Sequence, residues 1–195
     1  MDDTTRRALL KLARDTLTAS LAGKPLPALP ELPGGDDEHG GVFVTLRNHG
    51  RLRGCIGEFR TDRNLAAAVQ RMAEAVLSDP RFARCPVTLS EVPELSIEIS
   101  VLSPMRRTQN PEQLVPGVHG VYVRHGRQAG CFLPQVALEQ GWNARQLLDY
   151  CCAHKAGLPE DAWTRPDTEV YLFTAEILDE DQPPPAHPAG GSART

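Results

Sequence analysis

Residues 52–59 read Leu-Arg-Gly-Cys-Ile-Gly-Glu-Phe and place a cysteine between two glycines on a predicted β-strand. Glycine weakens a strand, so Gly54 and Gly57 indicate a bulge, or a place that a ligand or another backbone segment approaches closely. Strand alternation brings four residues to one face: Arg51, Arg53, Cys55 and Gly57. The two guanidinium groups on this face would stabilise a Cys55 thiolate. The segment therefore predicts a reactive thiol beside a cationic ligand-binding group.

Two other side chains are candidates for the proton transfer that a nucleophilic thiol requires. His119 begins a strand in Gly-Val-His-Gly, residues 117–120, and Glu98 lies on the polar face of an otherwise apolar strand. Each also has a structural interpretation, His119 as a hydrogen-bonded strand residue and Glu98 as a solvated residue at a sheet edge. Cys55 has one too, as a small buried hydrophobic residue. The residues alone leave both alternatives open.

Two further motifs carry candidate ligand-binding side chains. Asp-Pro-Arg-Phe, residues 79–82, is either a helix end with a local ion pair or a clamp that directs Arg81 toward an anionic ligand. Leu-Pro-Gln-Val, residues 133–136, ends a predicted strand at Pro134, where Gln135 could present its amide to a ligand. The predicted ligand-binding residues are therefore Arg81 and Gln135, together with three residues of the opening segment: Arg53, Gly54 and Gly57.

The opening hairpin has a partial copy later in the chain. The pattern His-Gly-Arg-x-x-Gly-Cys occurs at residues 49–55 and again at residues 125–131, where it ends in Cys131. A His-Gly pair supplies the positive φ that a tight turn requires. We therefore interpret the two copies as similar hairpins rather than as a duplicated site.

The bulk composition narrows the class of protein. The chain has 195 residues, of which 41% are hydrophobic and 24% charged, as is typical of a soluble globular protein with a full core. Its net charge of −4 argues against a nucleic-acid binder, although Arg47, Arg51 and Arg53 form a local cluster. No segment of the sequence has the length and apolar character of a membrane span.

Cysteine usage indicates a reducing compartment, and we expect the protein in the cytoplasm. The five cysteines are odd in number and include the adjacent pair Cys151 and Cys152, so they do not read as a disulfide framework. Cys151 and His154 share a helix face, but no second pair at ligand spacing follows, so we expect no metal site. We expect no cofactor either, since the sequence has no glycine-rich nucleotide motif.

Hydrophobic periodicity predicts hairpins and segregated helices, not alternating βαβ units. The predicted helices cover residues 4–22, 61–78 (capped by Thr61-Asp62) and 143–156 (capped by Asn143). The predicted strands cover residues 42–47, 51–58, 94–102, 118–124, 129–134 and 168–178. We expect an α+β fold with a central antiparallel sheet and flanking helices. One domain would span residues 1–178, with a proline- and glycine-rich loop at 24–41 and a disordered tail at 179–195.

Six motifs in this order resemble the AMME-syndrome-region domain family, whose prokaryotic members are called AmmeMemoRadiSam system protein A. They occur at residues 52–57, 79–82, 95–104, 117–120, 133–136 and 141–142. The resemblance covers roughly residues 5–178. It implies an α+β fold with a smaller second lobe, a cleft near Arg-Gly-Cys-Ile-Gly, and association with a Memo-like protein, related to dioxygenases, and a radical SAM protein. The family pattern usually lacks a cysteine at Cys131, which leaves Cys55 as the candidate thiol.

Two hypotheses of different class follow from these residues. In the first, the protein is a cysteine-dependent enzyme or enzyme component that acts on a small molecule. Cys55 is its nucleophile, Arg53 binds an anionic group, and His119 or Glu98 transfers protons. In the second, the same cleft belongs to a non-enzymatic module that binds a small molecule or a partner, with Arg53 and Arg81 reading charge. A third class, a nucleic-acid accessory factor, conflicts with the acidic net charge.

Overall fold

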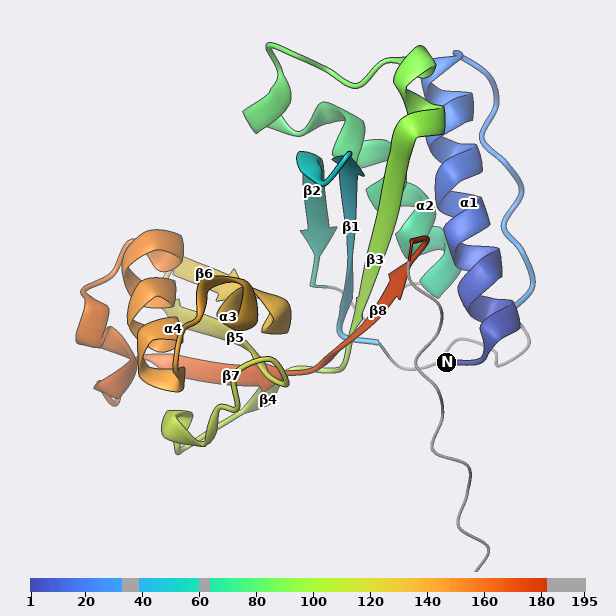
Figure 1. Cartoon of the computed structure of the whole chain (residues 1–195). Helices are drawn as coiled ribbons and strands as arrows, with labels where there is room; N and C mark the ends of the chain where they lie inside the picture. Colours follow the sequence, from blue (N-terminus) through green and yellow to red (C-terminus); the bar gives the residue numbers. More distant parts are fainter. Residues whose placement is uncertain (33–38, 60–63, 182–195) are drawn as a thin grey trace, which may run out of the picture.

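The structure is a computed structural model that describes residues 1–32, 39–59 and 64–181. It has the expected α+β fold, and its strands divide between two antiparallel sheets of four strands each. Each sheet carries its own helices, so the chain forms two lobes (Figure 1). In the described part of the chain, no helix is both long and apolar enough to cross a bilayer.

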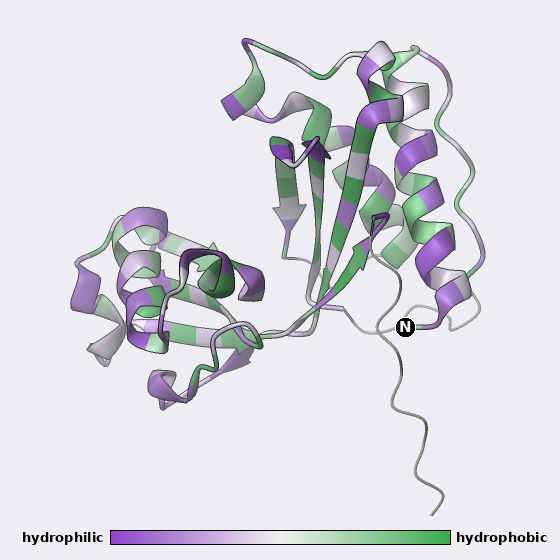
Figure 2. Ribbon diagram, in the orientation of Figure 1, coloured by the Kyte–Doolittle hydropathy of each residue, from purple (hydrophilic) through white to green (hydrophobic). Residues whose placement is uncertain are grey.

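The first lobe is built on a sheet with the strand order β2-β1-β3-β8, in which every neighbouring pair is antiparallel. Its inner strand β3 alternates between apolar and polar residues from Leu95 to Ser100, and Figure 2 shows this alternation. The apolar side faces the helices, because strand side chains point alternately to opposite faces. The strands are β1 (Gly41–Asn48), β2 (Arg51–Glu58), β3 (Leu95–Leu102) and β8 (Ala175–Asp179).

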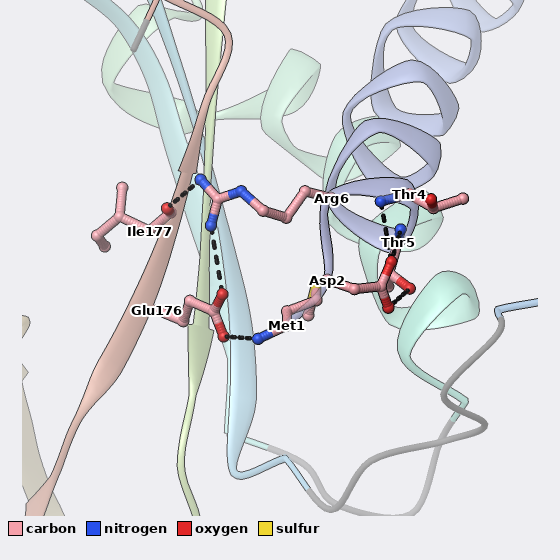
Figure 3. A network of polar contacts seen from close by, with 7 residues as sticks. All are labelled: Met1, Asp2, Thr4, Thr5, Arg6, Glu176 and Ile177. Carbon is pink, nitrogen blue, oxygen red and sulfur yellow. Dashed lines mark hydrogen bonds and ion pairs between the residues drawn. The ribbon is translucent and has the colours of Figure 1, made fainter. Parts of the chain in front are cut away.

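Helices α1 (Asp3–Leu21) and α2 (Leu65–Ala75) cover this apolar side. Together with the strands they enclose one hydrophobic core, which includes Leu9, Val44 and Ile97. The start of α1 is tied to β8 by polar contacts (Figure 3). Arg6 donates to Glu176 and to the carbonyl of Ile177, and the N-terminal amine lies 3.2 Å from the same glutamate.

The second lobe is built on a sheet with the strand order β4-β7-β5-β6 and has a core of its own. Helix α4 continues directly into a π-helical turn, Cys151–Ala156, which covers β5 and β6. Asn143 caps α4 as the sequence predicts. The elements are β4 (Arg106–Arg107), β5 (Gly120–His125), β6 (Gln128–Phe132), β7 (Glu169–Phe173), α3 (Pro134–Gln140) and α4 (Ala144–Tyr150).

Only two connections join the lobes in the described chain, and they lie side by side. One leads from β3 to β4 and the other from β7 to β8. They are hydrogen-bonded to each other, since Ser103 N donates to Thr174 O and Thr174 N donates to Ser103 Oγ. The predicted single strand at 168–178 is therefore two strands, because the chain leaves one sheet at Thr174 and enters the other.

Three other boundaries differ from the sequence prediction. Pro134 does not only end a strand, since it opens α3, where its fixed φ and missing N–H suit the first turn. Asn64 caps α2; the predicted cap at Thr61-Asp62 lies outside the described residues. In the predicted tail, Asp179 still belongs to β8 and Glu180 pairs with Arg14. Residues 182–195 of that tail, and residues 33–38 of the predicted loop, also lie outside the described residues.

Candidate functional site

The segment that carries Cys55 contains a β-bulge. Leu46 of β1 pairs with Gly54, but the next residue, Arg47, pairs with Leu52, so Arg53 is an extra residue in β2. The strict alternation that placed Arg51 and Cys55 on one face therefore breaks at Arg53. Downstream of the bulge the strand is regular.

The two glycines that flank Cys55 are required by the packing of the protein itself. A Cβ on Gly54 would lie 2.8 Å from Val76 Cγ2, on the side of the helices. A Cβ on Gly57 would lie 2.1 Å from the ring of Phe43, on the opposite side of the sheet. Neither distance occurs in real structures, so both positions exclude a side chain unless their neighbours move. The groups that closely approach Gly54 and Gly57 are thus Val76 and Phe43 of the protein itself.

Asp79 and Arg81 clamp the backbone of Cys55. The Asp79 carboxylate accepts from Cys55 N at 3.0 Å and from Arg81 Nε and Nη2 at 3.0 and 2.6 Å. Arg81 Nη2 also donates to Cys55 O at 2.9 Å. The Asp79 side chain is 1% exposed, and its hydrogen bond with Arg81 is the main cause that lowers its pKa to about 2. The local ion pair is therefore present, and 55% of the Arg81 side chain is exposed.

Arg53 is held by groups other than Cys55. Its guanidinium binds both carboxylate oxygens of Glu91, at 2.6 and 2.9 Å, and donates to the carbonyl of Cys85. The hydrogen bond that Arg53 donates to Glu91 is the main cause that raises the pKa of Arg53, and Cys85 contributes. In the same way Asp79 is the main cause that raises the pKa of Arg81, and Cys55 contributes. The cationic neighbour of Cys55 is thus Arg81.

Cys55 opens into a cavity of about 400 Å³ between the lobes, here termed the interlobe cavity. The first lobe contributes Phe43, Cys55, Ile56, Asp79, Pro80 and Arg81, and the second lobe contributes Cys131, Phe132, Leu133, Val136 and Lys155. The cavity is therefore lined by two thiols, one guanidinium group, one ammonium group and the carboxylate of Asp79, which is paired with Arg81. Its walls are otherwise mostly apolar.

The two thiols of the interlobe cavity come from the two copies of the His-Gly-Arg-x-x-Gly-Cys pattern. Both copies are hairpins, as predicted, with positive φ at His49, Gly50 and Gly126. The His-Gly-Arg-x-x-Gly-Cys pattern does not indicate that the two hairpins belong to different sheets whose faces meet. Burial raises the pKa of Cys131 to about 11, with an opposing contribution from Lys155. The Cys55 Sγ accepts a hydrogen bond from Thr45 Oγ1 at 3.3 Å.

Glu98 and Gln135, predicted separately, are brought together by the fold. Gln135 Nε2 of α3 lies 3.3 Å from Glu98 Oε1 and 3.3 Å from Ser100 Oγ, so this contact joins the two lobes. Glu98 lies on the inner strand β3, opposite Thr45, which in turn pairs with Cys55. It is half-buried there rather than solvated at an edge, and burial is the main cause that raises its pKa, with Arg47 opposing.

His119 lies in a different cavity from Cys55. It lines a cavity at the edge of the second sheet, and its Nδ1 accepts a hydrogen bond from Val115 N at 3.0 Å. The structure therefore does not bring His119 together with the thiol. The cysteine pair Cys151-Cys152 is buried in the core of the second lobe, and burial raises the pKa of both thiols.

Comparisons with known proteins agree with this architecture. The family model AMMECR1 matches residues 10–178. Protein MK0488 of Methanopyrus kandleri is 39% identical over 187 residues, covering 90% of this chain and 88% of the relative. Protein TK0174 of Thermococcus kodakarensis is 38% identical and covers 90% of each chain. The crystal structure of uncharacterized protein PH0010 from Pyrococcus horikoshii superposes with a TM-score of 0.84, at 37% identity, over 94% of this chain and 95% of that chain.

Proposed function

The chain belongs to the AMMECR1 family, and from that premise we propose that its interlobe cavity is a thiol-dependent site for a small molecule, with Cys55 as the nucleophile. The observation that carries this proposal is the meeting of Cys55 and Cys131 with Arg81 and Lys155 in one cavity of about 400 Å³. A cavity of this size suits a small metabolite. Because Arg81 is paired with Asp79, Lys155 is the cationic group that favours a ligand that carries negative charge.

The roles within the site follow from the contacts. Arg81, not Arg53, is the cation beside Cys55, because it donates to the Cys55 carbonyl while Arg53 is bound to Glu91. Of the two residues proposed for proton transfer, Glu98 is the better placed. It shares a cross-strand row with Thr45 and Cys55, and burial raises its pKa.

The proposed setting is an enzyme or enzyme component that works with a Memo-like protein and a radical SAM protein. This part rests on the resemblance of the sequence motifs. A reducing cytoplasm is the compartment that the proposal requires, because Cys55 and Cys131 must stay free to react.

Alkylation of the native protein tests the proposal. Iodoacetamide, with each modified cysteine quantified by mass spectrometry, should label Cys55 faster than Cys131, which is also half-buried and lines the same cavity. Arg81→Gln should slow the labelling of Cys55 several-fold and leave Cys85 unchanged. Arg53→Gln provides the matched control, because its guanidinium contacts Cys85 and should affect only that thiol. Thermal denaturation of both variants confirms that they remain folded.

A non-enzymatic binding module is the second candidate, and one observation favours it. The guanidinium groups of Arg53 and Arg81 are paired with Glu91 and Asp79, so both side chains are held in place without a ligand. Equal labelling rates at Cys55 and Cys131, unchanged by Arg81→Gln, would contradict the thiol proposal and support this module.

A further inference from the structure

A second cavity, of about 500 Å³, lies where the two connections between the lobes pass the edge strand β4. It is termed the edge cavity here. Its polar lining includes Arg106, Arg107, Thr108, Gln113 and His119, and its apolar lining includes Pro104, Leu172 and Phe173. Among the described residues no carboxylate lines it.

The charge of this lining distinguishes it from a cavity of about 680 Å³ that lies beside α1. That cavity has four basic side chains and four acidic ones, and Arg14 and Glu180 bind each other across it. Its charges are therefore largely compensated from within. The edge cavity has positive groups and no such compensation.

The two arginines of the edge cavity differ in how far a carboxylate compensates their charge. Arg106 has no ion-pair partner among the residues that the structure describes. Arg107 lies 3.6 Å from Glu169, but that carboxylate is bound more closely by Arg124, at 2.5 Å. Consecutive strand residues point to opposite faces, so Arg107 lies on the side of Glu169 and Tyr171, and Arg106 is the guanidinium that attracts an anion into this cavity.

His119 is held in place so that it presents a hydrogen-bond donor. Its backbone N donates to Val115 O at 2.9 Å, and Gly117, with φ of +81°, closes the turn between them. Because Nδ1 accepts from Val115 N, the ring carries its proton on Nε2. Thr108 Oγ1 accepts from Asn110 N, which leaves its hydroxyl hydrogen free to donate. The polar wall of the edge cavity is therefore rich in donors.

We propose that the edge cavity binds the phosphate group of a small phosphate monoester. A phosphate carries nearly two negative charges and three acceptor oxygens, which match the Arg106 guanidinium, the His119 ring N–H and the Thr108 hydroxyl. The cavity is larger than a phosphate ion, so the rest of the ligand lies on Pro104, Leu172 and Phe173. Apolar surface of this kind suits a ring or a short hydrocarbon.

Calorimetric titration of the full chain with phenyl phosphate tests the proposal. Phenyl phosphate should bind more tightly than inorganic phosphate, and benzoate, which has the ring but only a carboxylate, should bind more weakly. Arg106→Gln should weaken binding of phenyl phosphate about tenfold, because it removes a charge-assisted hydrogen bond. His119→Asn should weaken it several-fold, because an Asn oxygen can still accept from Val115 N while the Nε2 donor is lost.

Arg51→Gln is the matched control, since it removes one exposed arginine outside the edge cavity and should leave binding unchanged. Absence of phenyl phosphate binding, equal losses in Arg51→Gln and Arg106→Gln, or benzoate binding as tight as phenyl phosphate would each overturn the proposal. These measurements do not depend on Cys55, which lies in the interlobe cavity. Failure of the phosphate proposal would therefore leave the thiol proposal unaffected, and the reverse also holds.

Discussion

At the scale of single residues, Asp79 organises the surroundings of Cys55. It is buried, yet its carboxylate accepts hydrogen bonds from the backbone of Cys55 and from both the backbone and the side chain of Arg81. These contacts compensate the cost of burying a charge. The phenyl ring of Phe82 then lies against the guanidinium groups of Arg53 and Arg81, at 5.9 and 5.8 Å. One carboxylate thus couples the Asp-Pro-Arg-Phe motif to the Arg-Gly-Cys-Ile-Gly segment.

The low pKa of Asp79 predicts an acid-dependent loss of stability. Its pKa is about 2 in the folded protein and 3.8 for the ordinary group. The ionised carboxylate therefore stabilises the fold above pH 4, and this contribution is lost as the pH falls from 4 through 2. The difference corresponds to about 2 kcal/mol. Urea denaturation at pH 6 and at pH 2.5 should show Asp79→Asn less stable than wild type by about 2 kcal/mol at pH 6 and by less than about 1 kcal/mol at pH 2.5.

Asp167→Asn serves as the control, because this carboxylate is mostly exposed and its only described ion pair is a long one, 3.8 Å from His125. It should follow wild type at both pH values. An Asp79→Asn protein that lost the same stability at both pH values would show that the carboxylate acts through shape rather than charge.

At the scale of elements, local sequence signals account for some helix and strand boundaries, and the rest depend on long-range packing. The hairpin turns and the helix ends follow from local signals, as at His49-Gly50, Gly141 and Gly157, where the backbone takes positive φ. Helix α3 does not, because seven residues give too short a period to distinguish a helix from a strand end. The bulge at Arg53 is likewise invisible to alternation, which assumes a regular strand.

The cap of α4 gives a prediction at this scale. The side chain of Asn143 accepts from Gln146 N at 2.9 Å, and Gln146 Oε1 accepts from Asn143 N at 3.0 Å, which is a reciprocal capping box. Asn143→Ala should lower the free energy of unfolding by about 1 kcal/mol. Asn143→Asp should retain most of the stability that the cap contributes, because its side chain still has an oxygen that accepts from Gln146 N. Urea denaturation followed by tryptophan fluorescence measures both, and equal losses in the two variants would exclude the cap as the cause.

At the scale of the whole molecule, the two lobes have separate cores and meet through aromatic side chains. Phe59 contacts three rings at centroid distances of 5.4 to 5.7 Å: Phe43 of the first lobe and Tyr122 and Phe173 of the second. Phe43 lines the interlobe cavity and Phe173 lines the edge cavity. The aromatic cluster therefore lies between the two proposed sites and contacts both lobes.

Truncation of the central ring should weaken the contact between the lobes. Phe59→Ala removes a half-buried ring, so we expect a loss of about 2 kcal/mol, less than for a fully buried phenylalanine. It should also separate the unfolding of the lobes. Both tryptophans, Trp142 and Trp163, lie in the second lobe, so their fluorescence follows that lobe, while hydrogen exchange of α1 follows the first.

Phe82→Ala is the control, because its ring packs against arginines within the first lobe and not against the second. In Phe82→Ala the two probes should still report one transition. Coincident transitions in Phe59→Ala would show that the two connecting segments, and not the aromatic cluster, couple the lobes.

The candidate site was predictable only in part, for physical reasons. Cys55, Arg81, Gln135 and Glu98 lie at or beside the contact between the lobes, and each occurs in a short motif that the sequence shows directly. The pairing of Arg53 with Glu91 was not predictable, since the two are 38 residues apart in the chain and no pattern relates them. The placement of His119 away from the Cys55 thiol was not predictable for the same reason, because no sequence pattern relates the two residues.

The amino-acid sequence by itself determined the α+β class, the hairpins, the main helices and the family, because these depend on period, turn chemistry and ordered motifs within short segments. The tertiary structure alone decided that residues 168–178 divide between two sheets at Thr174, and that Cys131 faces the same cavity as Cys55. It also decided that Arg81 is the cation beside that thiol. Such placements depend on contacts between segments far apart in the chain, and local patterns do not encode them.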